Sequence, residues 1–576
     1  MRACPRILRI LFGLVVAVVC ANMPALAQNQ GPENCPRPTA GSKAAEPQDL
    51  RSERGVLEVT FRFLSSVDAQ GHVRYCYLYK DDSQSPTLRV NPGDTLILHL
   101  KNGITPEAAG AGAPAIPMHM QMQPGMCSKG KMMATSTNLH FHGLSIPPAC
   151  HQDDVLYTVV GPSASPFEYR FQIPNDQPPG LYWYHPHVHG YSNAQVLGGA
   201  SGALIVEGIE RVNPALAGLP ERVLVIRDQD LINPSAQPTS PDSAPHTVTL
   251  RDAEGDILNT GTDGGKPAKD LSLNFVPVAF PEYKPALIEM KPGGRELWRV
   301  LNASAITYAD LQIQYDAEAQ PLGIVALDGA PIDDNGAGGR GLFWRPHILV
   351  PPGGRAEFIL RGPPLNAHAS FATRGVDTGP AGENDPTRLL ATIVAAPDAP
   401  ALHSNLAAVP NVLPRQGPSA LKYVSPVRVR KLYFSEKLQN PADPKSPTVF
   451  MITVDGQTPA PFDPASTAPN ITVRQGDVED WIIENRSREL HAFHIHQIHF
   501  MLLDWNGVPV NEPFLRDTVN VAYWDGSSPV YPSIKLRMDF RSPKIVGDFI
   551  YHCHLLEHED GGMMGVIRVI PSASNP

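Results

Sequence analysis

The stretch His552-Cys553-His554 near the C-terminus constrains the fold more than any other part of the sequence. Cys553 is followed by His558 and Met563 in the spacing C-x4-H-x4-M, so a short loop can bring a thiolate, an imidazole and a thioether together. With a second imidazole, these ligands describe a blue-copper site with a weak axial methionine. Because side chains alternate between the faces of a strand, His552 and His554 should point away from Cys553. The sequence therefore predicts one strand that serves two metal centres.

Four H-x-H pairs occur along the chain, two towards each end. On an extended segment the two histidines of a pair lie on the same face. Neutral imidazole is a good copper ligand, and eight imidazoles are more than one ion needs. We therefore expect a cluster of three coppers where the first and last domains meet. The pairs are His140/His142, His185/His187, His494/His496 and His552/His554.

Strand parity also predicts where other histidines point. His491 lies three residues before His494, so on a strand it faces away from the H-x-H pair and can complete the cysteine site. His499 has the same parity and is expected to pack near that site, whereas His189 is expected to be structural. A single H-x-H pair is more often a surface feature, but the four pairs together with the C-x4-H-x4-M loop strongly favour metal binding.

These motifs resemble those of the three-domain multicopper oxidases of the laccase superfamily over about residues 55–572. The last two motifs are especially similar to those of bacterial laccase-like enzymes and periplasmic cuprous oxidases. The resemblance implies an all-β fold of three cupredoxin-like Greek-key β-sandwich domains. It also implies four coppers per chain: one type 1, one type 2 and two type 3. By the same resemblance the type 1 ligands are His491, Cys553, His558 and Met563, the type 2 ligands are His140 and His494, and the type 3 ligands are His142, His185, His187, His496, His552 and His554.

Composition and repeats agree with such a fold. The 60 prolines and 47 glycines favour short strands and loops over long helices. Strand–turn–strand segments at 87–94, 286–294 and 470–477 resemble one another, which suggests three related sandwiches. The predicted organisation is a signal peptide at 1–27, a flexible tail at 28–54, a first domain at 55–210 with trinuclear ligands, a copper-free second domain at 211–395, a linker at 396–427 and a third domain at 428–576 with type 1 and trinuclear ligands.

The N-terminus predicts export. A basic start, a short apolar run at 10–21 and the sequence Ala25-Leu26-Ala27 are typical of a cleaved signal peptide, and the run is too short to span a membrane. We expect a periplasmic or secreted protein with no membrane attachment after cleavage. The net charge of -10 and the lack of basic blocks argue against nucleic acid as a partner. Four cysteines then suggest one or two disulfides, whose pairing stays open: Cys35, Cys76, Cys127 and Cys150.

The expected reaction passes one electron at a time from a reductant to the type 1 site, through an exposed His558 or His491, and reduces dioxygen to water at the cluster. This reduction consumes four protons, so carboxylates are expected near the cluster. By resemblance Glu559 lies beside the type 3 coppers. Asp153 or Asp154, shortly after the first H-x-H pair, is the candidate near type 2.

The reductant and the oligomeric state stay open. One hypothesis is a laccase-like oxidase of phenols, aromatic amines or similar small molecules; the alternative is an oxidase of cuprous or other metal ions in copper tolerance. A catalytically silent copper-binding protein is disfavoured by the complete ligand set. Residues 116–133 contain alternating methionines, and soft thioethers select Cu(I), although such methionines can also be flexible packing. They are Met118, Met120, Met122, Met126, Met132 and Met133.

Overall fold

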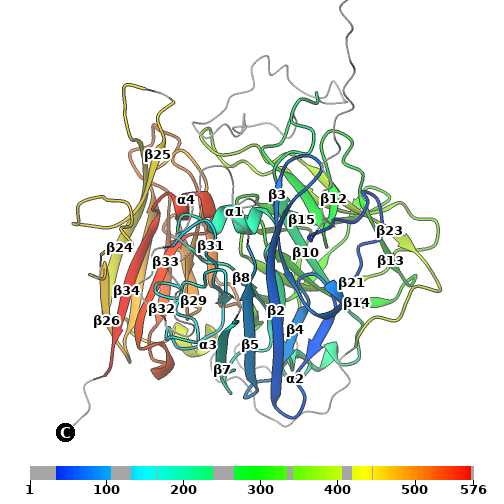
Figure 1. The fold of residues 1–576 in the computed structure, drawn as a ribbon, viewed down its shortest axis with the longest axis horizontal. Coiled ribbons are helices and arrows are strands. Elements are labelled where there is room, and N and C mark those ends of the chain that lie inside the picture. The colour runs from blue at the N-terminus through cyan, green and yellow to red at the C-terminus, as the bar shows by residue number, and fades with distance from the viewer. Residues whose placement is uncertain are drawn as a thin grey trace, which may run out of the picture. The chain divides into compact units, whose positions relative to one another are not determined.

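A computed structural model describes residues 34–104, 127, 132–163, 165–237, 265–333, 341–404, 418–443, 445–466 and 468–572. Within these residues the chain is built almost wholly from β-strands, with only short helices (Figure 1). The predicted all-β class is therefore confirmed. No helix in the described part of the chain is long and apolar enough to cross a membrane. The segment predicted as a signal peptide, and Met118, Met120, Met122 and Met126, lie outside the described residues.

The strands form three groups along the chain, named here the first, middle and third blocks. The first block spans 49–206 and contains two sheets. One sheet has the order β1 (Asp49–Arg51), β4 (Thr87–Val90), β9 (Gly202–Val206), β8 (Gly180–His185) and β6 (His140–His142). The other has the order β3 (Val73–Leu78), β2 (Val56–Val67), β5 (Thr95–Asn102) and β7 (Phe167–Gln172).

The middle block spans 221–395 and again contains two sheets. The larger sheet has β12 (Val276–Val278), β11 (Asp270–Leu273), β10 (Glu221–Gln229), β14 (Arg295–Asn302), β21 (Arg355–Arg361), β17 (Leu322–Leu327) and β18 (Ala330–Pro331), with β19 (Phe343–Arg345) on β17. The smaller sheet has β13 (Ala286–Met290), β23 (Arg388–Ala395), β22 (Ala369–Arg374), β15 (Ala309–Tyr315) and β16 (Glu318–Ala319), with β20 (Ile348–Val350) on β15.

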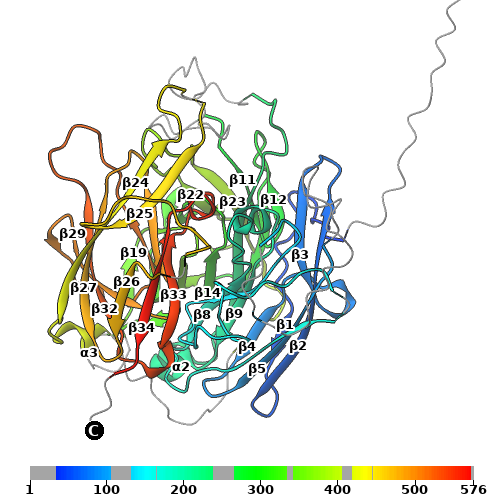
Figure 2. The same cartoon turned by 60° about the vertical axis from the view of Figure 1, so that its left-hand side comes forward.

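The third block spans 428–570, and its strands run from yellow to red in Figure 2. One sheet has β25 (Thr448–Val454), β24 (Arg428–Leu438), β27 (Val478–Asn485), β32 (Ser533–Asp539), β29 (Phe500–Trp505) and β30 (Val508–Pro509). The other has β26 (Ile471–Arg474), β34 (Met564–Ile570), β33 (Gly547–Cys553), β28 (His491–Ile495) and β31 (Thr518–Val521). The short helices of the chain are α1 (Ser192–Leu197), α2 (Ile209–Val212), α3 (Pro418–Lys422) and α4 (Leu556–Asp560).

The three blocks share one topology. In each, a strand–turn–strand segment passes from one sheet to the other: β4 to β5, β13 to β14 and β26 to β27. The first strand of each segment pairs in parallel with the last strand of its block, namely β9, β23 or β34. The second strand pairs in parallel with β2, β10 or β24. This repeat explains the resemblance of the three segments in the sequence, while the predicted domain boundaries stay predictions.

Alternating side chains build the core of each sandwich. In β2, Leu57, Val59, Phe61 and Phe63 are buried while the residues between them are exposed. One face of this strand therefore packs inward and the other faces solvent, as expected for a strand of a β-sandwich.

Residues 34–54 differ from the predicted flexible tail. β1 pairs in parallel with β4, the N–H of Ala44 donates to the oxygen of Leu287, and a disulfide joins Cys35 to Cys76. The sequence lacks a periodic apolar pattern here because β1 has only three residues. The predicted linker also contains structure, since α3 buries Leu421 in a small apolar cluster. A second disulfide joins Cys127 to Cys150, so the predicted disulfides are present and their pairing is resolved.

Candidate metal centres

Two antiparallel strand pairs position the histidine motifs. In the first block β6 pairs with β8, so that His140 lies opposite His185. In the third block β28 pairs with β33, so that His494 lies opposite His552. The two strand pairs meet, and the rings of His140 and His496 stack 3.7 Å apart. His187 and His552 are 365 residues apart in the sequence, yet their Nε2 atoms lie 3.5 Å apart. Motifs from distant parts of the chain therefore share one site.

The eight histidines of the H-x-H pairs are all buried, none being more than 2% exposed. Their ring nitrogens include three groups of three in which the ligand atoms lie within 4.8 Å of one another. A group of this size matches the reach of a single metal ion. The groups are His140/His142/His494, His142/His185/His554 and His187/His496/His552.

The hydrogen bonding of these rings fits bound copper. Nδ1 of His140 lies 3.0 Å from Asp153, and Nε2 of His142 lies 3.2 Å from Asp517. The opposite nitrogen of each ring is buried and has no hydrogen-bond partner among the described residues. Such atoms are rare in folded proteins, whereas a metal would use that lone pair and the partner on the other nitrogen would fix the ring. The same holds for Nε2 of His185 and of His494, and for both nitrogens of His496 and His554.

Electrostatics favour the neutral form of seven of these imidazoles. Burial, and then the proximity of the other histidines, lowers the pKa of His142, His185, His187, His494, His496 and His554 well below the usual range. Burial lowers the pKa of His552 to about 3. A neutral imidazole is the form that binds a metal, so the site is preorganised for cations.

A second candidate centre lies on the other face of β33. Sγ of Cys553 is 3.5 Å from Nδ1 of His491 and 4.0 Å from Nδ1 of His558. Met563 is buried beside them: its oxygen accepts from the N–H of Cys553, and its N–H donates to the oxygen of His558. The sulfur of Cys553 and two imidazoles thus converge, and the backbone of Met563 is held beside them. Cys553 points to this centre, while its neighbours His552 and His554 belong to the groups described above.

The sequence led us to expect an exposed His558 or His491, and this expectation is wrong. The Nε2 atoms of both rings, which do not face Cys553, are covered. The two histidines are 2% and 0% exposed, respectively. Nε2 of His558 lies 3.4 Å from Glu489, and Nε2 of His491 lies 2.9 Å from Glu436. The ring of Phe450 stacks on His558 at 4.2 Å. These covering residues come from other strands and loops, so the local motif gave no sign of them.

The structure distinguishes the two aspartates proposed near the cluster. Both oxygens of Asp153 lie 3.0 Å from Nδ1 of His140, and one accepts from the N–H of Phe141. Asp154 instead accepts from the N–H of Tyr157 and closes a turn. Burial raises the pKa of Asp154 to about 6.

Glu559 lies behind two other histidines of the cluster. Its Oε1 is 3.5 Å from Nδ1 of His187 and accepts from the hydroxyl of Ser192, while its Oε2 is 3.5 Å from Nδ1 of His552. Burial, and then the neighbouring Asp560, raises the pKa of Glu559 well above its usual range. This carboxyl therefore favours its protonated form in the protein.

Asp517 and Arg355 are site residues that sequence reasoning missed. Besides its contact with His142, Asp517 offers its backbone oxygen to Nδ1 of His494 at 2.8 Å. Arg355 on β21 donates to both carboxylate oxygens of Asp517 at 2.7 Å, and both side chains are fully buried. The pair is separated by 162 residues, so only the folded chain reveals it.

His499 also belongs to this region. Its Nε2 lies 2.8 Å from the oxygen of Asp328 and 3.7 Å from Asp517, rather than beside the cysteine site as strand parity suggested. The parity argument fails because β28 ends at Ile495 and Gln497 adopts a left-handed conformation (φ 59°) before β29 begins.

Comparison with known proteins agrees with the geometry. Models of the multicopper oxidase family match residues 130–211 and 441–573. The multicopper oxidase mco of Staphylococcus aureus is 23% identical over 439 residues, 75% of this chain and 77% of that protein. A laccase of Bacillus subtilis is 30% identical over 115 residues, 18% of this chain and 21% of that protein. The solved structure of a multicopper oxidase from Campylobacter jejuni, described as a metallo-oxidase, has a TM-score of 0.61 and 22% identity, covering 93% of this chain and 96% of that one.

The two matched regions contain all four H-x-H pairs and the C-x4-H-x4-M loop. The histidine groups and the cysteine centre fit the four coppers that such proteins use as cofactor. The chain therefore contains domains of the multicopper oxidase family, whose members are copper-dependent oxidoreductases that use dioxygen.

Proposed function

We propose that the eight-histidine site holds three coppers and that the cysteine centre holds the fourth. In this assignment His140 and His494 bind the type 2 copper, and His142, His185, His187, His496, His552 and His554 bind the type 3 pair. The type 1 ligands are His491, Cys553, His558 and Met563. The observation that carries the assignment is the convergence of buried ring nitrogens that have no hydrogen-bond partner in the described part of the chain.

When bound, copper supplies one-electron transfer at the type 1 site and dioxygen reduction at the group of three. The protein supports this chemistry by joining the two sites covalently, because Cys553 lies between His552 and His554 in one segment. The protein also buries all of these side chains, which excludes water from the connection.

Asp153 and Glu559 are the proposed holders of protons for dioxygen reduction. Each carboxyl touches a proposed ligand: Asp153 at Nδ1 of His140, and Glu559 at Nδ1 of His187. Asp154 is not included, because its contact is with the backbone of Tyr157.

The proposed reductants are phenols, aromatic amines or similar small molecules, as in a laccase. The similarity of part of the chain to the laccase of Bacillus subtilis supports this class. The reductant would reach the type 1 site at the covering side chains of Phe450 and Glu489, since His558 itself is buried.

The alternative is oxidation of a metal ion. The carboxyl group of Glu436, which is only partly buried, lies 2.9 Å from the outer nitrogen of His491, and a negative charge at that position would attract a cationic reductant. The similarity to a solved structure described as a metallo-oxidase points the same way.

We also propose that the chain is exported to the periplasm or secreted, and that it divides into domains at the boundaries predicted from the sequence. Two disulfides, Cys35–Cys76 and Cys127–Cys150, support an oxidising compartment. The shared topology of the three blocks supports the division.

Oxygen consumption by the copper-loaded chain tests the choice of reductant. It is measured with a dimethoxyphenol and, separately, with Cu(I), for the wild type and for a variant in which Met118, Met120, Met122 and Met126 are serine. That variant keeps the Cys127–Cys150 disulfide. Phenol turnover that needs no added copper and survives the substitutions supports a laccase, whereas strong Cu(I) turnover that the substitutions abolish supports the alternative. Cys553→Ser is the control and should be inactive with either reductant.

A further inference from the structure

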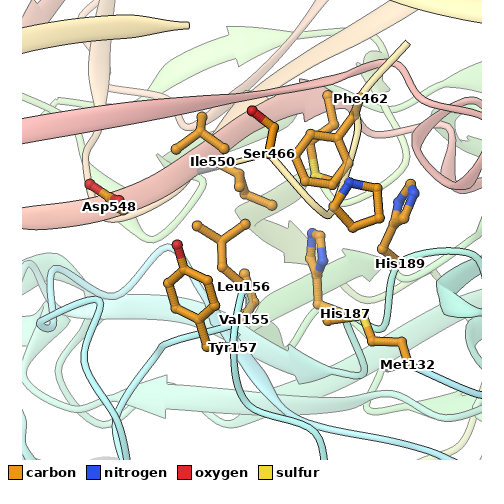
Figure 3. A pocket seen from close by; sticks show the side chains of 13 residues that line it. Met132, Val155, Leu156, Tyr157, His187, His189, Phe462, Ser466, Asp548 and Ile550 are labelled. Atoms are coloured by element: carbon orange, nitrogen blue, oxygen red, sulfur yellow. The ribbon is translucent and has the colours of Figure 1, made fainter. Parts of the chain in front are cut away.

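A narrow pocket leads to the eight-histidine site between the first and third blocks (Figure 3). Its volume of about 30 Å³ exceeds what one ordered water needs, so an ion or a small molecule fits. His187 forms one wall, and its Nε2 lies 3.5 Å from Nε2 of His552. The pocket therefore reaches one of the proposed copper ligands, His187.

Soft donors line this pocket. Thioethers come from two distant parts of the chain, Met132 and Met564, and an imidazole comes from His189. Nδ1 of His189 is buried and has no hydrogen-bond partner among the described residues, while its ring packs edge-on against Phe462 at 5.0 Å. In Figure 3 the imidazoles of His187 and His189 extend in the same direction, and Met132 is another of the lining side chains.

We propose that this pocket is the inlet through which Cu(I) reaches the eight-histidine site, with Met132, Met564 and His189 as transient ligands. The proposal rests on the assignment of His187 as a copper ligand under the proposed function.

The physical argument has two parts. The proposed ligands are at most 2% exposed, so copper needs a path into the folded protein. Thioether and imidazole groups bind Cu(I) well and bind hard cations poorly, so this lining selects the ion that the site requires. His189 follows His187 by two residues and both line the pocket, so an ion can pass from one imidazole to the next.

The apolar part of the lining, including Val155 and Ile550, would also pass dioxygen. The experiment must therefore separate a path for copper from a path for dioxygen. The type 1 site provides an internal control, because none of its ligands lines this pocket.

Copper uptake by the full-length apoprotein tests the proposal. A Cu(I) salt is added without oxygen, uptake is stopped at intervals with a Cu(I) chelator, and copper per chain is measured. After oxidation the type 1 site is read from its visible absorption, and the type 2 copper from its electron paramagnetic resonance signal. The variants are His189→Phe, which keeps the aromatic packing, His189→Met, which restores a soft donor, and Met132→Leu. Met501→Leu is the control, a buried methionine outside the pocket.

We expect His189→Phe to slow the filling of the eight-histidine site about tenfold, a size typical of the loss of a supporting ligand contact. His189→Met should recover most of the rate, Met132→Leu should slow it less, and the type 1 site should fill at the wild-type rate in every variant.

Equal rates of copper uptake in the wild type and in His189→Phe would overturn the proposal that this pocket is the inlet. So would equal slowing at both sites, since that would indicate a general effect on folding. If the loaded His189→Phe variant takes up copper normally but has a raised KM for dioxygen, the pocket serves dioxygen instead. If the wild type binds copper only at the type 1 site, the ligand assignment itself fails, and the inlet fails with it.

Discussion

The middle block and the two outer blocks share a strand topology but contribute differently to the copper centres. The outer blocks supply every proposed ligand, and the middle block supplies none. The middle block nevertheless touches both centres. Arg355 binds Asp517 behind His142, and the hydroxyl of Tyr308 donates to the oxygen of Leu490, the residue before His491.

This difference shows that the residues that place a proposed ligand are not the same as the residues that hold its ring in orientation. Short strands in the outer blocks fix which face each histidine occupies, but they leave the second nitrogen of each ring to be held by other groups. The middle block helps to provide that support through buried side chains and a close turn at Gly353, where an added Cβ would lie 2.7 Å from Nε2 of His554. A block without metal ligands can therefore control metal binding.

The largest expected effect comes from Arg355→Lys. Lysine keeps the charge but cannot bind both oxygens of Asp517, so the carboxylate behind His142 would shift. We expect copper affinity at the eight-histidine site to fall about 10- to 100-fold and the free energy of unfolding of the apoprotein to fall by about 3 kcal/mol. Copper per chain after dialysis against a chelator, and urea unfolding of the apoprotein, measure the two effects.

Arg299→Lys is the matched control for this prediction. Arg299 is also a fully buried arginine of the middle block, and it pairs with Glu221 and Glu357 rather than with a residue that touches a histidine of the site. It should cost similar stability and leave copper affinity unchanged. Equal copper loss in both variants would mean that the middle block acts only through general stability.

A smaller effect is expected from Gly353→Ala. Gly353 has φ +80°, and its Cβ would meet the ring of His554. The equivalent Gly293, in the other Pro-Gly-Gly turn of the middle block, has φ +66° and nothing within 4 Å. Both substitutions add backbone strain of about 1 kcal/mol, but only Gly353→Ala adds crowding, worth about 1–3 kcal/mol. Unfolding by urea and copper content should show that only Gly353→Ala disturbs the site; identical results for the two would remove the role assigned to this turn.

The grouping of the histidines and of Cys553 could be predicted from the sequence because the pattern is local. The H-x-H spacing and the C-x4-H-x4-M loop determine which side chains share a face, and strand alternation alone separates Cys553 from His552 and His554. The all-β class follows in the same way from short apolar runs and frequent turns. The parity argument fails at His499, where Gln497 leaves the extended conformation between two strands.

The support of the ligands could not be predicted, because it depends on long-range contacts between single charged residues. Nothing near Asp517 in the sequence points to Arg355, and nothing near His558 points to Phe450 or Glu489. The sequence predicted a flexible tail over residues 34–54 for a related reason. The defined structure of this segment depends on the disulfide between Cys35 and Cys76 and on a three-residue strand. Such contacts leave no periodic signal.

A still smaller effect should follow from Tyr308→Phe, which removes one hydrogen bond between the middle block and the segment before His491. Tyr308 is 1% exposed and its hydroxyl lies 2.9 Å from the oxygen of Leu490. We expect a loss of about 1 kcal/mol in the free energy of unfolding and a measurable shift in the visible absorption of the type 1 site. Tyr315→Phe, which removes a bond to the oxygen of Arg361 within the middle block, should cost similar stability and leave that absorption unchanged. A shift in both variants, or in neither, would argue against a link through Tyr308.

The smallest expected effect on the copper centres belongs to Asp385 of the middle block, which should change the pH dependence of stability alone. This carboxyl is 4% exposed, accepts from the N–H of Tyr308 and lies 3.4 Å from Arg388. Burial raises the pKa of Asp385 from 3.8 to about 7. The unfolded chain therefore loses this proton at lower pH than the folded chain, so the group reduces the free energy of unfolding as pH rises from about 4 to about 7 and reduces it no further above that range.

Asp385→Asn mimics the protonated acid and removes this dependence. Relative to the wild type, the variant should gain about 2 kcal/mol in the free energy of unfolding between pH 5 and pH 8, measured by urea unfolding at both values. Because Asp385 contacts the backbone of Tyr308 rather than any proposed ligand, copper content should not change with the substitution at either pH. A difference between variant and wild type that stays constant with pH would show that Asp385 is ionised throughout. A change in copper content would instead show that the charge of Asp385 also affects copper binding. The middle block would then support the copper centres through Asp385 as well as through Arg355, Gly353 and Tyr308.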